Sequence, residues 1–301
     1  MKEERKLIQL ANQCLVVSLP VEIIKKFGLK KSQPVSLKEM GNDLLLSFSK
    51  SSLKNKIDLN CSKMNERIIQ RMIQAAYKSG IEEIKMKIDP NKKKTIEEYV
   101  RGFVGAVILN TDKDSLVIKI SLDAESFDFQ ELLKKAFFLV NESSKEIFTA
   151  IEKKDKNKIK ELEIDREHVV KHLNLGKLML NKKNLLSIRE ANFYFYIFSL
   201  LDNICDLYYR ILTNSEKNLI NKEDMNFFEK TNEMLEASFN LYFGELKIDL
   251  LYQLREEIFS KYKQKSYYTA ILSTIIKLIL ELAECKISLD LEKSRLERSL
   301  S

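Results

Sequence analysis

The sequence predicts a mainly α-helical protein with a small β head at its N-terminus. The chain has only seven Gly and three Pro in 301 residues, and all three Pro lie before residue 91. Pro interrupts helices and Gly weakens them, so the later part of the chain is open to long helices. After about residue 125, apolar residues recur at the three- and four-residue spacing of a helix face, whereas short apolar runs between turn residues fill the first fifty.

Composition and charge indicate a soluble cytoplasmic protein. Lys and Arg number 51 against 44 Asp and Glu, a net charge of +7. The cysteines are widely spaced and form no C-x-x-C pair, so we expect a reducing compartment rather than a disulfide framework or a zinc ribbon. The N-terminus does not have the form of a secretory signal, and no apolar stretch is long enough to span a bilayer, so we expect no membrane insertion.

Residues 1–50 predict a small basic β domain that dimerises. Its expected elements are the strands Leu7–Leu10 and Cys14–Pro20, the helix Val21–Phe27 ending at Gly28, and a hairpin of Pro34–Lys38 with Leu44–Phe48. Residues 1–56 hold eleven Lys and Arg against five Asp and Glu, which is most of the net charge of the chain. A sheet this small has too little core to stand alone, so we expect it to pair with a second copy.

The cations of this head are candidates for contacts with DNA phosphates. Lys and Arg neutralise backbone phosphates whatever the base sequence, and clustering in one small domain favours that use. The competing interpretation is that they are solvated lysines of a lysine-rich protein. The candidate residues are Lys2, Arg5, Lys6, Lys25, Lys26, Lys30 and Lys31.

Residues 51–125 predict an α/β connector with its own core. A polar linker, Ser51–Asn60, comes first. The expected elements after it are the helix Met64–Lys78, the strand Ile81–Ile88, a helix from Thr95 to about Phe103, and a hairpin of Ala106–Asn110 with Leu116–Ile120. The segment has no nucleophile–base pair, phosphate loop or histidine, so we expect a scaffold and no enzymatic activity.

Residues 126–301 predict six helices, arranged as two three-helix bundles over 126–214 and 215–301. Short connections place successive helices antiparallel. The first three expected helices run from Asp128 to about Lys153, from near Asn157 to near Asn181, and from near Ser187 to about Leu212. The last three run from Asn221 to Phe243, from Glu245 to Lys263, and from Ser266 to Ser294.

Pairs of acids four residues apart recur along these helices. Residues at i and i+4 lie on one helix face, so each pair is two stacked like charges that repel unless a cation lies between them. The pairs border apolar seams, where two helices could share a hard cation with oxygen ligands, so we expect a divalent or ferric metal ion. The alternative is a solvated acidic face; a carboxylate-bridged metalloenzyme is disfavoured because no general base is evident. The candidate ligands are Glu161, Asp165, Asp202, Asp206, Glu245, Asp249 and Glu281, with Cys285 in the last place.

Two stretches of the chain resemble known families. Val17–Pro20 followed by Glu22–Lys31 and a strand–turn–strand resembles the SpoVT-AbrB DNA-binding domain, as found at the head of archaeal PhoU-like phosphate uptake regulators. The repeated acid pairs resemble those of the PhoU family, in which they bind metal ions. The resemblance implies an AbrB-like swapped-hairpin barrel, a connector, and two PhoU-like three-helix bundles.

The resemblance also implies a function. We expect a homodimeric, DNA-binding transcriptional regulator of phosphate uptake. The alternative is an adaptor in which the head only dimerises and the bundles dock a phosphate transporter or a sensor kinase.

Overall fold

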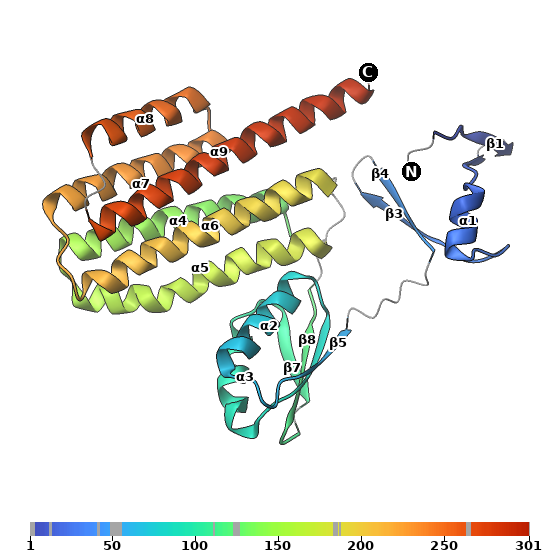
Figure 1. Cartoon of the computed structure of the whole chain (residues 1–301), viewed down its shortest axis with the longest axis horizontal. Helices are drawn as coiled ribbons and strands as arrows, with labels where there is room; N and C mark the ends of the chain where they lie inside the picture. The colour runs from blue at the N-terminus through green and yellow to red at the C-terminus, as the bar shows by residue number, and fades with distance from the viewer. Residues whose placement is uncertain are drawn as a thin grey trace. The chain divides into compact units, whose positions relative to one another are not determined.

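The computed structural model describes residues 4–11, 14–40, 43–48, 56–110, 112–122, 127–182, 186, 188–262 and 266–300. The chain divides into two units, Met1–Lys54 and Asn55–Ser301. The first unit holds short strands and one short helix, and the second holds a four-stranded sheet and the long helices (Figure 1). The prediction of a mainly α-helical chain with a small β head is confirmed.

The first unit, called the head below, is a helix between two hairpins. Strand β1 (Ile8–Ala11) pairs antiparallel with β2 (Cys14–Val16), and β3 (Ser36–Met40) pairs antiparallel with β4 (Asp43–Ser47). Between them lies α1 (Val21–Phe27), which ends at Gly28 in the left-handed conformation, with φ of 58°. Glycine adopts this conformation without the steric cost of a Cβ, so the predicted helix end at Gly28 is confirmed.

Two contacts hold the end of α1 against the second hairpin. The rings of Phe27 and Phe48 lie with their centroids 5.2 Å apart. The side chain of Gln33 donates a hydrogen bond from Nε2 to the carbonyl of Phe48, at 2.9 Å. The turn after α1 is therefore fixed to the end of β4 through its own side chains.

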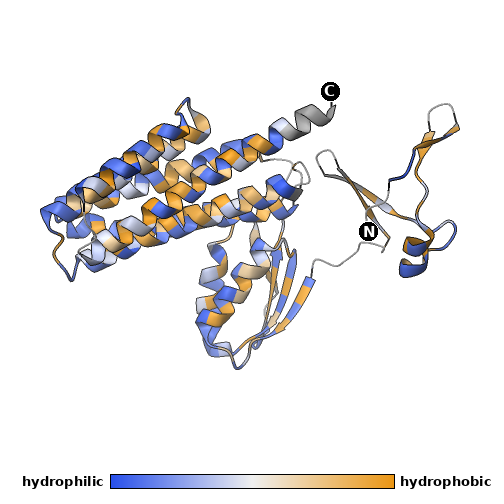
Figure 2. Cartoon of the chain, turned by 45° about the horizontal axis from the view of Figure 1, so that its top comes forward, coloured by the Kyte–Doolittle hydropathy of each residue, from blue (hydrophilic) through white to orange (hydrophobic). Residues whose placement is uncertain are grey.

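A four-stranded sheet opens the second unit. Its strand order is β5 (Lys56–Asn60), β6 (Glu83–Lys87), β8 (Ser115–Ile120) and β7 (Ala106–Asn110), with only β5 and β6 parallel. Apolar and polar residues alternate along β5 and β6, and Figure 2 shows apolar residues of the sheet in orange and polar ones in blue. The buried face meets the helices α2 (Glu66–Lys78) and α3 (Lys93–Arg101) in one hydrophobic cluster.

Two sequence-based predictions for this segment are wrong. The predicted linker Ser51–Asn60 ends in strand β5, because Ile57 and Leu59 alternate with polar residues and pack against the core of the sheet. The helix predicted from Thr95 begins at Lys93 instead. It continues directly from the 3₁₀ turn η1 (Pro90–Lys92), where the Asp89 side chain accepts from the Asn91 N–H and starts the first turn earlier.

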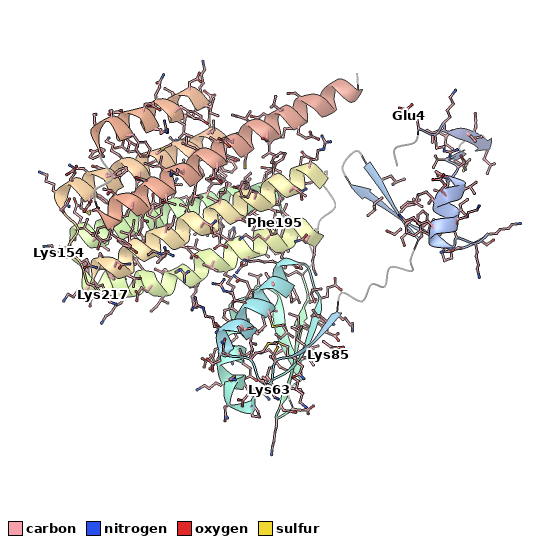
Figure 3. All side chains as sticks on the ribbon, in the orientation of Figure 1. Glu4, Lys63, Lys85, Lys154, Phe195 and Lys217 are labelled. Atoms are coloured by element: carbon pink, nitrogen blue, oxygen red, sulfur yellow. The ribbon has the colours of Figure 1, made fainter. Side chains whose placement is uncertain are left out.

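Long helices form the rest of the second unit. They are α4 (Phe129–Glu152), α5 (Lys156–Lys182), α6 (Ile188–Ser215), α7 (Lys222–Phe243), α8 (Ile248–Lys261) and α9 (Tyr267–Leu300). The Asp128 side chain accepts from the N–H groups of Gln130 and Glu131 and so caps the first turn of α4, which was predicted to start here. Lys154 and Lys217, in the α4–α5 and α6–α7 connections, lie at the same end of the bundle, as antiparallel neighbours require (Figure 3).

Residues of all six helices contribute to one hydrophobic core, and the division into two three-helix bundles stays a prediction. Helix α4 contacts α7 as well as α5 and α6, and α9 contacts α6 as well as α7. The Tyr208 ring of α6 stacks on Phe228 of α7 with centroids 5.4 Å apart, so aromatic contacts cross the predicted boundary at residues 214 and 215. Helix α8 lies on the outside, against α7 and α9 (Figure 1).

Apolar surface on α5 joins the two parts of the second unit. Leu175, Leu178 and Met179 belong to the same buried cluster as α2, α3 and the sheet, whereas Leu173 and Leu180 belong to the bundle core. One helix thus contributes to two cores and fixes the α/β segment against the bundle. Among the helices of the described residues, none combines the length and the apolarity needed to cross a membrane.

Gly176 allows the close approach of α5 and α6. A Cβ built on Gly176 would lie 2.2 Å from the ring of Phe198, which is fully buried on α6. Gly176→Ala should therefore destabilise the fold by about 1–3 kcal/mol through overpacking, although alanine normally stabilises a helix interior by about 1 kcal/mol. Urea unfolding measures the change. The cost should shrink in a Phe198→Leu background, and a Gly176→Ala variant more stable than the unmutated chain would contradict this packing.

Candidate functional site

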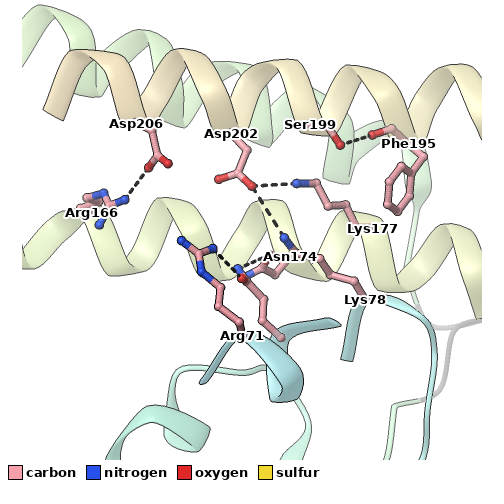
Figure 4. A network of polar contacts seen from close by, with 10 residues as sticks. Arg71, Lys78, Arg166, Asn174, Lys177, Phe195, Ser199, Asp202 and Asp206 are labelled. Atoms are coloured by element: carbon pink, nitrogen blue, oxygen red, sulfur yellow. Dashed lines mark hydrogen bonds and ion pairs between the residues drawn. The ribbon is translucent and has the colours of Figure 1, made fainter. Parts of the chain in front are cut away.

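The acids of α6 face cations of α5. The carboxylate of Asp206 accepts a hydrogen bond from the Arg166 guanidinium, and Asp202 Oδ2 lies 2.7 Å from Lys177 Nζ (Figure 4). Arg166 and Lys177 are eleven residues apart, which is three helical turns, so both lie on one face of α5. Because α5 and α6 run antiparallel, this face meets the two acids in reverse order.

Asp202 also lies near a cation of the α/β segment. Lys78, the last residue of α2, places its Nζ 3.9 Å from Asp202 Oδ2. The backbone carbonyl of Lys78 accepts a hydrogen bond from Asn181 Nδ2 of α5, at 2.6 Å. Asp202 therefore joins three helices, and its contacts lie where α2 meets the bundle.

The contacts of Asp202 with Lys177 and Lys78, called the Asp202 cluster below, are more buried than the Arg166–Asp206 pair. The Lys177 side chain is only 4% exposed and that of Asp202 19%, whereas Arg166 and Asp206 are about half exposed. Burial, and after it the charge of Lys177, lowers the pKa of Lys78 to about 8. Two ammonium groups thus share one carboxylate in a poorly hydrated site, and Lys78 is the more weakly compensated of the two.

The predicted partners of these acids on α5 lie elsewhere. Glu161 and Asp165 are exposed, and Glu161 lies 3.9 Å from Lys158 one turn away on the same helix. Asp165 lies about 100° around α5 from Arg166, which takes the position facing α6. The structure therefore brings Asp202 and Asp206 together with cationic side chains and not with the acids of the first pair.

The acids of the second repeat do not form a helical pair. Glu245 lies in the connection before α8, which begins at Ile248 and not at the predicted Glu245, so Glu245 and Asp249 do not share one helix face. Gly244 breaks the helix and Lys247 becomes the residue before its first turn. Asp249 lies in that first turn, where a negative charge complements the partial positive charge of the helix N-terminus.

Glu281 has a partner on α6. Its carboxylate accepts a hydrogen bond from the hydroxyl of Tyr196, and this bond raises the pKa of Tyr196 to about 12. Cys285, one turn further along α9, is buried, and burial raises the pKa of its thiol to about 11. Without a bound metal ion, the thiol is therefore neutral near pH 7.

Metal binding at these positions stays a prediction. Within the part of the chain that the structure describes, no group of three or more His, Cys, Asp or Glu side chains is placed to hold a metal ion. A cation at Asp202 or Asp206 would have to displace Lys177 and Lys78, or Arg166, from the carboxylate oxygens. Comparison of the chain with protein-family models, with curated proteins and with solved structures gave no match.

The candidate DNA-binding cations of the head are exposed where they are described. Lys25 and Lys26 occupy the last turn of α1, and Lys30 and Lys31 follow in the turn after Gly28. Arg5 and Lys6 lie in the extended segment before β1, and Lys2 lies outside the described residues. Four of the candidates thus gather at the C-terminal end of α1. Cations there also complement the helix dipole, which is a structural use that needs no DNA.

The cations that pair with the acids are not among the residues predicted from the sequence to form the site. Arg166 directly follows Asp165 in the first acidic motif, and a search for cations at helical spacing would have found Lys177 three turns later. Lys78 lies more than one hundred residues from Asp202 in the chain, and no local pattern connects the two.

The two α6 acids should respond differently to neutralisation. Asp202→Asn leaves the buried ammonium of Lys177 without a counter-charge, so we expect a loss of about 3 kcal/mol in the free energy of unfolding. Asp206→Asn breaks a half-exposed pair and should cost no more than about 1 kcal/mol. Urea unfolding of both variants under the same conditions provides the matched comparison. Equal costs for the two would show that the Asp202 cluster is not the tighter of the two contacts.

Proposed function

We propose that this chain is a DNA-binding regulator of phosphate homeostasis, in which the head forms a homodimer and contacts DNA. The helical unit then carries the signal-receiving role of a PhoU-like regulator. The observation that carries the proposal is the apolar surface of the head. The phosphate assignment rests on the sequence resemblance of the acid pairs and of the Val17–Lys31 segment described above.

The head exposes the apolar residues that its strands would normally bury. None of its described residues is buried. Leu10 is 73% exposed and Leu15 60%, and large apolar side chains on α1 and on both strands of the second hairpin are exposed as well. Isolated apolar residues on a surface are ordinary, but a unit with many exposed apolar residues and no buried one among its described residues needs a partner.

A second copy of the head is the partner that fits best. The two hairpins are separate two-stranded sheets, so each leaves strand edges unpaired. Two-stranded hairpins are marginal alone in water, and interleaving four of them from two copies would pair edges and bury the apolar faces together. This arrangement is the swapped-hairpin barrel that the sequence resemblance implies.

Dimerisation would also double the positive charge available to DNA. Each copy contributes the exposed lysines around the end of α1, and a twofold arrangement presents two such groups to the phosphates on a duplex. Few of the head's described residues are acidic, so repulsion from phosphates is small. The head therefore combines a reason to dimerise with a charge that favours nucleic acid.

The alternative is a head that only dimerises while the helical unit docks a phosphate transporter or a sensor kinase. The position of Lys25 and Lys26 favours this alternative, because their charges stabilise the C-terminal end of α1 without any ligand. Both readings require the dimer, and only the first requires DNA binding.

The dimer can be tested in the full chain with acidic substitutions in the head. Leu15→Glu with Leu45→Glu places charges in the apolar interface, so the chain should sediment as a monomer where the unmutated chain is a dimer. Ile164→Glu with Leu219→Glu, on exposed positions outside the head, makes the same charge change and should leave the dimer intact. A monomeric unmutated chain with a folded head would contradict the proposal.

DNA binding can be tested by the salt dependence of affinity. Replacing Lys25, Lys26, Lys30 and Lys31 with Gln should weaken binding similarly for all DNA sequences, and each lost phosphate contact should lower the salt slope by about 0.9. The matched control replaces four exposed lysines of the second unit, Lys63, Lys85, Lys113 and Lys119. If the head variant still dimerises and the two sets bind DNA equally, the adaptor function is the better one.

A further inference from the structure

A polar cleft lies between the α/β segment and the bundle, and Arg166, the partner of Asp206, is one of the residues that line it. It has a volume of about 580 Å³ and is walled by one face each of α2, α3 and α5. The lining residues of α2 are spaced as Arg67, Gln70, Arg71 and Gln74, which is one continuous helix face. Packed helices normally present apolar faces to one another, so three polar faces around an open space indicate a cleft for a polar ligand.

The inner end of the cleft is fixed by hydrogen bonds. Gln74 Nε2 donates to Asn174 Oδ1 of α5 at 3.5 Å, and Asn174 is only 4% exposed. The Arg71 guanidinium donates from Nη1 to Gln74 Oε1, at 3.2 Å. A buried amide on α5 thus positions the Gln74 amide on α2, which in turn orients the guanidinium of Arg71, a residue that lines the cleft. Figure 4 shows Asn174 and Arg71 where α2 meets α5.

A cation from each of two helices lies near this inner end. The Gln74–Asn174 contact is followed by the Lys78–Asn181 contact, so α2 and α5 run in the same direction here. One turn before the Gln74–Asn174 contact, α2 supplies Arg71 and α5 supplies Lys171, and both residues line the cleft. Three carboxylates also line the cleft. Glu98 lies on α3 beside Tyr99, and Glu163 and Glu167 of α5 lie at least one turn before Lys171, toward the outer end. Within the described residues, no ion pair engages Arg71 or Lys171.

A phenol completes the inner wall. Tyr99 of α3 lines the cleft, and burial raises the pKa of its hydroxyl while the charge of Arg71 acts in the opposite direction, as expected for neighbours. The Tyr99 ring packs edge-on against Phe103, with centroids 5.2 Å apart, so the ring is held in place. A protonated phenol is a hydrogen-bond donor, and with a guanidinium and an ammonium it offers donors of the kinds that recognise oxyanions.

We propose that this cleft binds a small organic anion, with its phosphate or carboxylate group held at the inner end by Arg71, Lys171 and Tyr99. A guanidinium binds either oxyanion through two parallel N–H donors, and the ammonium adds a point charge. The apolar surface of Val170 and Phe103 then contacts the organic part of the ligand, and the outer charges contact its polar end. This inference does not depend on the proposed function.

The cleft is well placed to affect how the two parts of the second unit pack. Its inner end adjoins the contact between α2 and α5, and Arg71 contributes to lowering the pKa of Lys78 at the Asp202 cluster. An anion beside Arg71 would offset part of this positive charge. Binding would therefore stabilise the packing of the α/β segment on the bundle, and a rise in thermal stability should report it.

The experiment uses the full chain with pyrophosphate and citrate as probes, at constant ionic strength set with chloride. Thermal melting and calorimetry should show saturable binding of at least one probe; a response to pyrophosphate alone indicates a phosphate ligand, and to citrate alone a carboxylate ligand. Arg71→Gln with Lys171→Gln should weaken that binding by about tenfold or more, since two charge-assisted hydrogen bonds are lost. Tyr99→Phe removes one donor and keeps the ring, so its effect should be smaller.

The matched control is Arg101→Gln with Lys160→Gln. These exposed residues lie on α3 and α5 but outside the cleft, and the change in net charge is the same. Circular dichroism without probe confirms that both variants fold. Equal loss of binding in the two double variants would mean general charge attraction only and would overturn the proposal. So would the absence of saturable binding of either probe to the unmutated chain at millimolar concentrations.

Discussion

The buried ammonium of Lys177 is the constraint on which the second unit depends. A charge that is 4% exposed is stable only with a counter-charge, and Asp202 is the acid that lies against it. This requirement fixes the register of α5 against α6, because a shift of either helix by one turn would separate the pair. The close approach of Gly176 and Phe198 sets the same register by shape. Charge and packing thus specify one alignment of the two helices.

The same cluster extends the constraint to the α/β segment. Lys78 shares Asp202, and its backbone carbonyl accepts from Asn181 of α5. The cost of a second poorly hydrated ammonium is offset by apolar contacts, since three α5 residues complete the core of the sheet. Burying such apolar side chains stabilises by about 1.5–3 kcal/mol each, which exceeds what one shared ion pair contributes. The apolar contacts therefore hold the segment on the bundle, and the charges select how it sits.

Much of the fold could be predicted from local pattern, and the parts that could not depend on distant contacts. Helix boundaries at Asp128 and Gly28 follow from caps and turn residues that act within a few positions. One hydrophobic core includes residues of α4, α6, α7 and α9. The apolar pattern of each helix is compatible both with one shared core and with two separate bundles, so the pattern alone does not decide between them. Strand β5 was missed because five residues with two apolar positions are too short a signal. Interactions between residues close in the sequence determine where helices and strands form, and contacts between distant segments determine which of them pack together.

The candidate site shows the same limit more sharply. The acid spacing of Asp202 and Asp206 correctly predicts one helix face, and the electrostatic argument correctly requires cations there. The sequence does not distinguish a metal ion from Arg166 and Lys177, because helix–helix alignment decides which side chains arrive. Asp202 already lies 2.7 Å from the Lys177 ammonium. Metal binding there would leave this buried ammonium without a counter-charge, so it is less favourable than metal binding to two carboxylates that have no cationic partner. An acid pair on a helix is therefore evidence for a site only after the cations of the neighbouring helix have been placed.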